Sequence, residues 1–164
     1  MKEIILNSLK KGLVTKHLAE FEKIGIELKT EIYKKFGRSF HIRQVDTGSC
    51  NACISEIIAA GNPIYDIQRF GIDFVASPRH ADAILVTGPV SKNMVLALKK
   101  TYDAMPGPKF VITLGACAKD GGIFKGSYYV ENGVGNILPV DAHVSGCPPN
   151  PTEIIKAILG FLRK

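Results

Sequence analysis

The sequence predicts an α/β fold, a parallel sheet with helices on both faces, preceded by an N-terminal helical arm. Short strand-like runs alternate with helix-like segments along the chain, which is typical of parallel sheets. Two of these runs, residues 83–86 and 110–114, are apolar throughout, as expected of strands buried on both faces. With 164 residues, 46% of them hydrophobic, the chain can form one domain with a substantial core.

The first part of the chain is expected to be helical. Residues 1–37 are interpreted as a helical arm and residues 38–164 as the α/β domain. Gly25 is the position at which the arm could break. An apolar stripe with helical spacing predicts contact with the domain or with a neighbouring subunit, and interfacial contact with a membrane is the alternative. The stripe comprises Phe21, Ile24, Leu28, Ile32 and Phe36.

The remaining elements follow from apolar runs bounded by glycine and proline. Strands are expected at residues 40–45, 72–76, 83–86, 110–114 and 137–140. Helices are expected at residues 52–60, 91–104 and 152–162. Ser91 and Thr152 are the candidate caps of the second and third of these helices. In a sheet of this kind, sites form at the carboxyl ends of the strands.

The net charge of +6 is concentrated near the N-terminus. Residues 1–43 hold ten Lys and Arg against five Asp and Glu, whereas the rest of the chain holds eleven against ten. This distribution suits an arm lying against an acidic partner or an anionic surface, and it argues against a nucleic-acid-binding domain. No apolar run is long enough to cross a bilayer, and Ile4-Ile5-Leu6 is too short for a signal peptide. The expected compartment is therefore the cytoplasm.

The four cysteines lie close after strand-like runs. Cys50 and Cys53 follow the first expected strand, Cys117 follows the fourth, and Cys147 follows the fifth. The helix after the C-x-x-C pair would point backbone N–H groups at the sulfurs, which favours negative charge on them. Four thiolates at one edge of a sheet, with no cysteine left over, fit a single [4Fe–4S] cluster.

Three other interpretations of these cysteines stay open. Cys50 and Cys53 could form a thiol–disulfide centre, which leaves Cys117 and Cys147 unexplained. A structural zinc site usually pairs two C-x-x-C units, which this sequence lacks. The cysteines could also be small buried hydrophobic residues. His80, beside Arg79, is a candidate for tuning the electrostatics of a cluster.

Several short motifs after residue 37 resemble one known family. They are Arg38-Ser39, Gly48-Ser49-Cys50-Asn51-x-Cys53-x-x-Glu56-Ile57, Arg69-Phe70-Gly71, Ser77-Pro78-Arg79-His80-Ala81-Asp82, Val86-Thr87-Gly88, Gly115-Ala116-Cys117, Gly121-Gly122, Pro139-Val140-Asp141 and Gly146-Cys147-Pro148-Pro149. The chain resembles the small subunit of membrane-bound group 4 [NiFe] hydrogenases, of the energy-converting and formate hydrogenlyase types. It also resembles the 20 kDa, cluster-N2 subunit of respiratory complex I.

The resemblance implies a flavodoxin-like α/β fold and one [4Fe–4S] cluster held by Cys50, Cys53, Cys117 and Cys147. Two residues separate the first two cysteines, as in the hydrogenases, whereas complex I subunits carry adjacent cysteines there. Glu56 matches the acidic position after the cysteine pair, which implies a proton-relay role; a carboxylate in the first helix turn is the simpler interpretation.

The function implied is electron relay to or from the active site of a large subunit, in a complex that reduces protons or oxidises H2. The implied partners are a hydrogenase-type large subunit, a ferredoxin-like multi-cluster Fe–S subunit and membrane subunits of the same complex. The complex would lie on the inner face of the cell membrane. The alternatives within the family are a quinone or sulfur reductase subunit related to complex I, and a relative whose partner has lost nickel.

Overall fold

The structure is a computed structural model, and it describes residues 16–163 of the chain. Its helices are α2 (Lys16–Phe36), α3 (Ala52–Ala60), α4 (Val95–Asp103), α5 (Gly115–Asp120) and α6 (Pro151–Leu162). Its strands are β1 (Phe40–Asp46), β2 (Ile72–Phe74), β3 (Ala83–Thr87), β4 (Phe110–Leu114) and β5 (Ala142–Val144). The connections contain the 3₁₀ helices η1 (Ile67–Phe70), η2 (Pro78–His80), η3 (Lys92–Met94), η4 (Gly122–Phe124) and η5 (Val134–Asn136).

The strands form one parallel sheet in the order β2-β1-β3-β4-β5. This is the flavodoxin-like order, so the predicted fold class is confirmed. The chain moves outward from β1 in both directions, and the order reverses between β1 and β3. In such sheets the loops that leave the carboxyl ends of the strands build the functional site.

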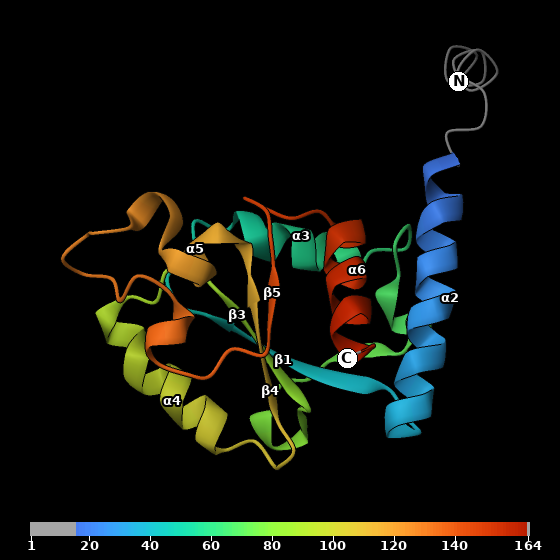
Figure 1. Cartoon of the computed structure of the whole chain (residues 1–164), viewed down its shortest axis with the longest axis horizontal. Coiled ribbons are helices and arrows are strands. Elements are labelled where there is room, and N and C mark those ends of the chain that lie inside the picture. The colour runs from blue at the N-terminus through green and yellow to red at the C-terminus, as the bar shows by residue number, and fades with distance from the viewer. Residues whose placement is uncertain (1–15, 164) are drawn as a thin grey trace, which may run out of the picture.

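Helices cover the two faces of the sheet separately (Figure 1). On one face, α2, α3 and α6 pack on a hydrophobic cluster that contains Ile42, Leu85 and Ile112. On the other face, α4 and the segment around η5 pack on a second cluster that contains Ile84 and Val111. Alternate residues of one strand thus enter opposite clusters, because successive side chains of a strand point to opposite faces.

Helix α2 runs without a break through Gly25, so the expected break at this position is wrong. A Cβ atom at Gly25 would collide with the ring of Phe70, which packs directly against the helix backbone. The stripe residues Phe21, Leu28 and Ile32 are buried in the same cluster as the sheet. The division into an arm (1–37) and a domain (38–164) stays a prediction, and the part of the arm before Lys16 lies outside the described residues.

The fifth strand differs from the prediction. It spans Ala142–Val144, whereas Ile137–Val140 was expected to be the strand. Ile137 and Leu138 instead follow η5 and pack into the cluster under α4. Asp141 sets the register of the edge strand, since its carboxylate accepts from the Val111 backbone N–H at 2.7 Å.

Two expected helix caps also differ. Helix α6 is capped by Asn150, whose side chain accepts from the Glu153 N–H while Glu153 accepts from the Asn150 N–H, and Thr152 lies inside the first turn. Ser91 precedes η3 and makes no side-chain cap bond; its N–H bonds to the Thr47 carbonyl. None of the helices described between residues 16 and 163 is long and apolar enough to span a membrane.

Candidate functional site

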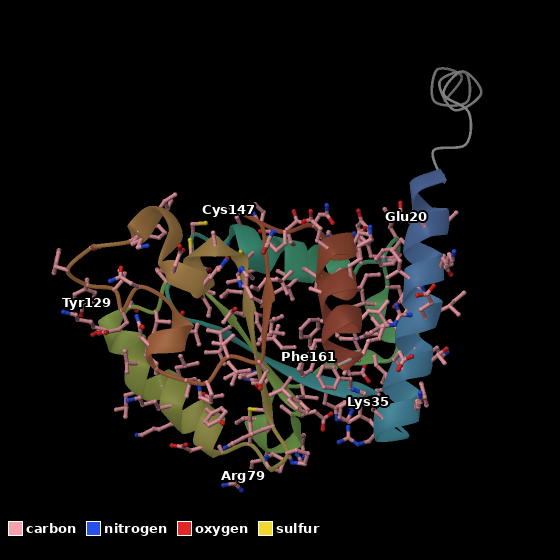
Figure 2. All side chains as sticks on the ribbon, in the orientation of Figure 1. Glu20, Lys35, Arg79, Tyr129, Cys147 and Phe161 are labelled. Atoms are coloured by element: carbon pink, nitrogen blue, oxygen red, sulfur yellow. The ribbon has the colours of Figure 1, made fainter. Side chains whose placement is uncertain are left out.

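The structure brings the loops that carry all four cysteines to the carboxyl edge of the sheet. Cys50 lies in the loop after β1, Cys53 in the first turn of α3, Cys117 in α5 directly after β4, and Cys147 in the loop after β5. Figure 2 labels Cys147 at this edge, close to α3 and α5. Cys53 and Cys117 are buried, Cys50 and Cys147 are exposed, and all four are free thiols. The site therefore has a buried inner side and an accessible outer side.

The loop after β1 is held by short hydrogen bonds. The Asp46 carboxylate accepts from the backbone N–H groups of Gly48 and Ser49, at 3.1 and 2.8 Å. The backbone N–H and the hydroxyl of Thr47 both donate to the Thr87 carbonyl, at 2.9 and 2.7 Å. These bonds tie the ends of β1 and β3 together and fix the position from which the C-x-x-C segment starts.

Gly115 joins three of the cysteine-bearing segments. It has φ of +85°, and a Cβ atom at this residue would lie 2.7 Å from the sulfur of Cys53. The next residue, Ala116, donates its N–H to the carbonyl of Gly146 at 2.9 Å, immediately before Cys147. The turn after β4 therefore touches both α3 and the loop after β5, and it can do so only because residue 115 has no side chain.

A second glycine lies against Cys117. Gly122 has φ of +50°, and a Cβ atom here would lie 2.9 Å from the sulfur of Cys117. The glycine-rich segment at 121–135 was expected to bring the chain close to a cluster or a partner, and its first part does pass close to a cysteine sulfur. Sequence reasoning gave no role to Thr47 and Thr87, because an isolated threonine after an apolar strand carries no distinctive signal.

Burial and neighbouring charges affect the protonation of the two inner thiols. The pKa of Cys53 is raised to about 11, mainly by burial and then, in decreasing order, by the charges of Cys117, Cys50, Cys147 and Glu56. Burial also raises the pKa of Cys117, as does the charge of Cys147, while a hydrogen bond from the Ile123 backbone N–H opposes the rise. The buried thiols thus hold their protons at neutral pH until a cation replaces them.

The residues suit a cluster better than a single ion. Among residues 16–163, no three Cys, His, Asp or Glu side chains lie close enough together to hold one metal ion. A tetrahedral zinc ion needs all of its thiolates at about 2.3 Å, so these sulfurs do not form a ready zinc site. A [4Fe–4S] cluster takes four thiolates that are spread around a larger body, and Gly115 and Gly122 let the backbone lie directly against the two buried sulfurs.

The other candidate residues lie partly near the carboxyl edge of the sheet and partly at its amino edge. Glu56 is half-buried in α3, one turn after Cys53, and thus close to the site. His143 lies on β5 and shares a hydrogen bond of 2.9 Å with the Thr113 hydroxyl. Arg79 and His80 belong to η2, which precedes β3, and Figure 2 shows Arg79 across the molecule from Cys147. The hypothesis that His80 tunes a cluster is therefore wrong.

Comparison with known proteins places the chain in a family. Residues 50–161 match the family described as NADH ubiquinone oxidoreductase, 20 Kd subunit. The chain is 45% identical over 134 residues to the probable membrane-bound hydrogenase subunit mbhJ of Pyrococcus furiosus, covering 82% of this chain and 80% of that one. It is 45% identical over 119 residues to a subunit of the NADH-quinone oxidoreductase of Bacteroides thetaiotaomicron, covering 72% of this chain and 60% of that one.

One solved structure has the same fold and is also similar to this chain in sequence. A chain of the membrane-bound sulfane sulfur reductase, an archaeal respiratory membrane complex, aligns with a TM-score of 0.69 and 30% identity, covering 84% of this chain and 75% of that one. The family match covers all four cysteines, Glu56 and the last strand. This chain belongs to the family of the NADH ubiquinone oxidoreductase 20 Kd subunit.

Proposed function

We propose that this chain is the electron-transfer subunit of a membrane-associated complex of the group 4 [NiFe] hydrogenase type. It holds one [4Fe–4S] cluster through Cys50, Cys53, Cys117 and Cys147. The observation that carries this proposal is the meeting of the three cysteine-bearing segments around Gly115, on a carboxyl edge where the fold family forms its sites. Similarity to the membrane-bound hydrogenase subunit supports the type of complex.

The chain's own residues bind and orient the cluster, which when bound takes up and gives back one electron at a time. Cys53 and Cys117 anchor it from the buried side, and Cys50 and Cys147 from the exposed side. The N–H group of Ile123 donates to the sulfur of Cys117, and such hydrogen bonds to ligand sulfurs influence the reduction potential. The exposed side lets a partner with its own redox centre come close.

Glu56 is the proposed proton relay. Its carboxylate is half-buried, one helical turn beyond Cys53, and it is close enough for its charge to act on that thiol. A half-buried carboxylate beside a redox site is the kind of group that can pass a proton to or from it.

The proposed partners are a hydrogenase-type large subunit, a ferredoxin-like multi-cluster Fe–S subunit and membrane subunits of the same complex. The proposed location is the cytoplasmic side of the cell membrane, where the chain is a peripheral subunit. The names of the related proteins, which include a membrane-bound hydrogenase and a respiratory membrane complex, support a membrane-associated assembly.

A second candidate function is electron transfer in a complex that reduces sulfur or quinone. The structural match to a chain of the sulfane sulfur reductase favours it, because that match extends over 84% of this chain. The two functions require the same cluster in this subunit and differ in the partner. Purified complex assayed with H2 and with polysulfide as alternative substrates distinguishes them.

The cluster assignment is tested in complex purified without oxygen. Iron and acid-labile sulfide are measured together with the EPR spectrum of the reduced sample. Cys117→Ser is expected to remove the signal of this cluster, whereas Ser145→Ala, an exposed serine beside the Cys147 loop, is expected to leave it unchanged. A Cys117→Ser complex with an unaltered signal and full iron content contradicts the ligand assignment.

A further inference from the structure

Part of the sheet has no α-helix over it. The chain passes from β2 to β3 through residues 75–82, whose only helix is the short η2. Parallel strands are usually joined by a crossover with an α-helix that covers one face. Because this crossover has none, loop residues such as Val75 and Ala81 pack on the β1 and β2 part of the α4 face in place of an α-helix.

The side chains on this region are identified by strand alternation. Val45 packs into the cluster under α4, so Arg43 and His41 lie on the same face of β1. Asp73 is the β2 neighbour of His41 in the register and lies on this face too, because Ile72 and Phe74 point into the opposite cluster. The region is therefore polar, unlike the face under α4.

Arg43 has a donor that the described residues leave unsatisfied. Its Nε atom is buried, and no hydrogen-bond partner for it exists within residues 16–163. A buried donor without a partner is costly, so most such groups are satisfied in the functional assembly. A carboxylate supplied from outside would be a strong partner for this guanidinium.

A hollow lined mainly by basic residues lies at the amino edge of the sheet, and its lining includes His41, which shares a face of β1 with Arg43. It has a volume of about 360 Å³ and is lined by Arg38, His41, Arg79, His80, Asp82 and Pro106. Its one acidic residue is already engaged, since Asp82 accepts two bonds from Arg38, at 2.7 and 2.9 Å, and one from the His41 backbone N–H. We call Arg38, His41, Arg43, Arg79 and His80 the basic strip.

We propose that an acidic segment of a partner subunit covers the basic strip and places a carboxylate against Arg43. The surplus of positive charge selects an acidic partner, and the recessed Arg43 requires a side chain that reaches inward. A lipid surface fits less well, because a flat surface cannot reach the recessed guanidinium and none of the large exposed apolar side chains of the described residues belongs to the strip. The inference rests on the proposed function only in requiring a partner subunit.

The strip lies at the opposite edge from the cysteines, as the positions of Arg79 and Cys147 in Figure 2 show. The chain thus has two separate surfaces for partners, one at the thiols and one at the strip. A subunit that relays electrons between partners needs contacts on more than one side, which this arrangement provides.

The test compares Arg43→Met with Lys29→Met, a matched change at an exposed lysine of α2. The fraction of chain bound in purified complex is measured over a dilution series. Arg43→Met is expected to weaken retention by about 30-fold or more, the loss typical of removing one member of a buried charge pair at an interface. Lys29→Met is expected to retain the chain as the wild type does.

Denaturant unfolding of the full-length chain gives a second measurement. Arg43→Met is expected to weaken retention in the complex without lowering the stability of the free chain. Arg43→Met should leave the midpoint of the free chain unchanged or raise it, because the substitution removes an unsatisfied polar group. Normal retention of Arg43→Met, or equal loss in both variants, overturns the proposal. The EPR spectrum distinguishes this failure from failure of the proposed function, since in the latter case the wild-type complex would lack the signal that Cys117→Ser is expected to remove.

A photo-crosslinking residue at Arg79 identifies the occupant in the intact complex. Adducts to an Asp- or Glu-rich peptide of another subunit support the proposal. Adducts confined to lipid or to a second copy of this chain, or no adduct at all, overturn it.

Discussion

Gly115→Ala tests the contact on which the site depends. The substitution adds one methyl group at the point where the turn after β4 meets the sulfur of Cys53. The residue has φ of +85°, a region that alanine rarely adopts, and the new Cβ would lie 2.7 Å from that sulfur. The Cys53 side chain is buried in the first turn of α3 and cannot simply swing into solvent.

The expected cost has two parts. A left-handed backbone conformation costs a residue with a side chain about 1–2 kcal/mol relative to glycine. The collision adds about 1–3 kcal/mol, as is typical of an extra methyl group in a closely packed place. Since the two parts overlap when the loop relaxes, we expect Gly115→Ala to lower the free energy of unfolding by about 2–4 kcal/mol.

Gly160→Ala is the matched control. Gly160 lies in α6, has helical neighbours on both sides, and has no atom within 4 Å of the position of a Cβ. The same substitution there is expected to stabilise the chain by about 0.5–1 kcal/mol, because alanine is the better helix former. The two variants thus make an identical chemical change with opposite predicted signs.

Denaturant unfolding of the iron-free chain measures both effects. Iron and sulfide content of the reconstituted chain then reports whether the site survives, and Gly115→Ala should bind less of both. A Gly115→Ala chain as stable as the Gly160→Ala chain, with wild-type iron content, would refute the close approach of β4 and α3 and the account of the site built on it.

Three further predictions concern ion pairing, capping and pH. Asp82→Asn should destabilise the chain by about 1–2 kcal/mol, measured by denaturant unfolding, because it removes the charge that receives both bonds from Arg38; an unchanged midpoint contradicts this. Asn150→Ala should cost about 1 kcal/mol through loss of the α6 cap, whereas Thr152→Ala should cost clearly less, and a reversed order would restore Thr152 as the cap. The iron-free chain should lose stability, by an amount of the order of 1 kcal/mol, as pH rises from about 9 to about 11. Folding raises the pKa of Cys53 to about 11, so in this pH range the unfolded chain releases a proton that the folded chain keeps. A denaturant midpoint that rises with pH would contradict the predicted loss of stability.

Much of the fold was predictable because its signals are local. The helix at Ala52–Ala60 and the strand at Phe110–Leu114 have the expected bounds, since a glycine directly follows each of them. The cysteine placement was also predictable, because parallel strands deliver the loops at their carboxyl ends to one edge. The family resemblance, which depends on short motifs, is confirmed.

The fifth strand was not predictable in the same way. Ile137 and Leu138 form a short apolar run, and such a run can be a strand or can fill a gap in a core. The position of the fifth strand depends on a residue distant in sequence. Val111 pairs with Asp141, which places Ala142–Val144 beside β4. The cap of α6 at Asn150 was missed for a smaller reason, since an equally suitable Thr152 lies two residues further on.

The alternation of elements, the number of thiols and the family could all be read from the residues alone. The folded arrangement was needed to learn that Gly115 lies against Cys53 and that Arg79 and His80 lie at the edge away from the cysteines. It was also needed to learn that the Nε atom of Arg43 is buried without a partner among residues 16–163. The physical reason is that periodicity and composition report on neighbours along the chain. Contacts between loops depend instead on strand order, on crossover length and on whether a side chain leaves room for another segment.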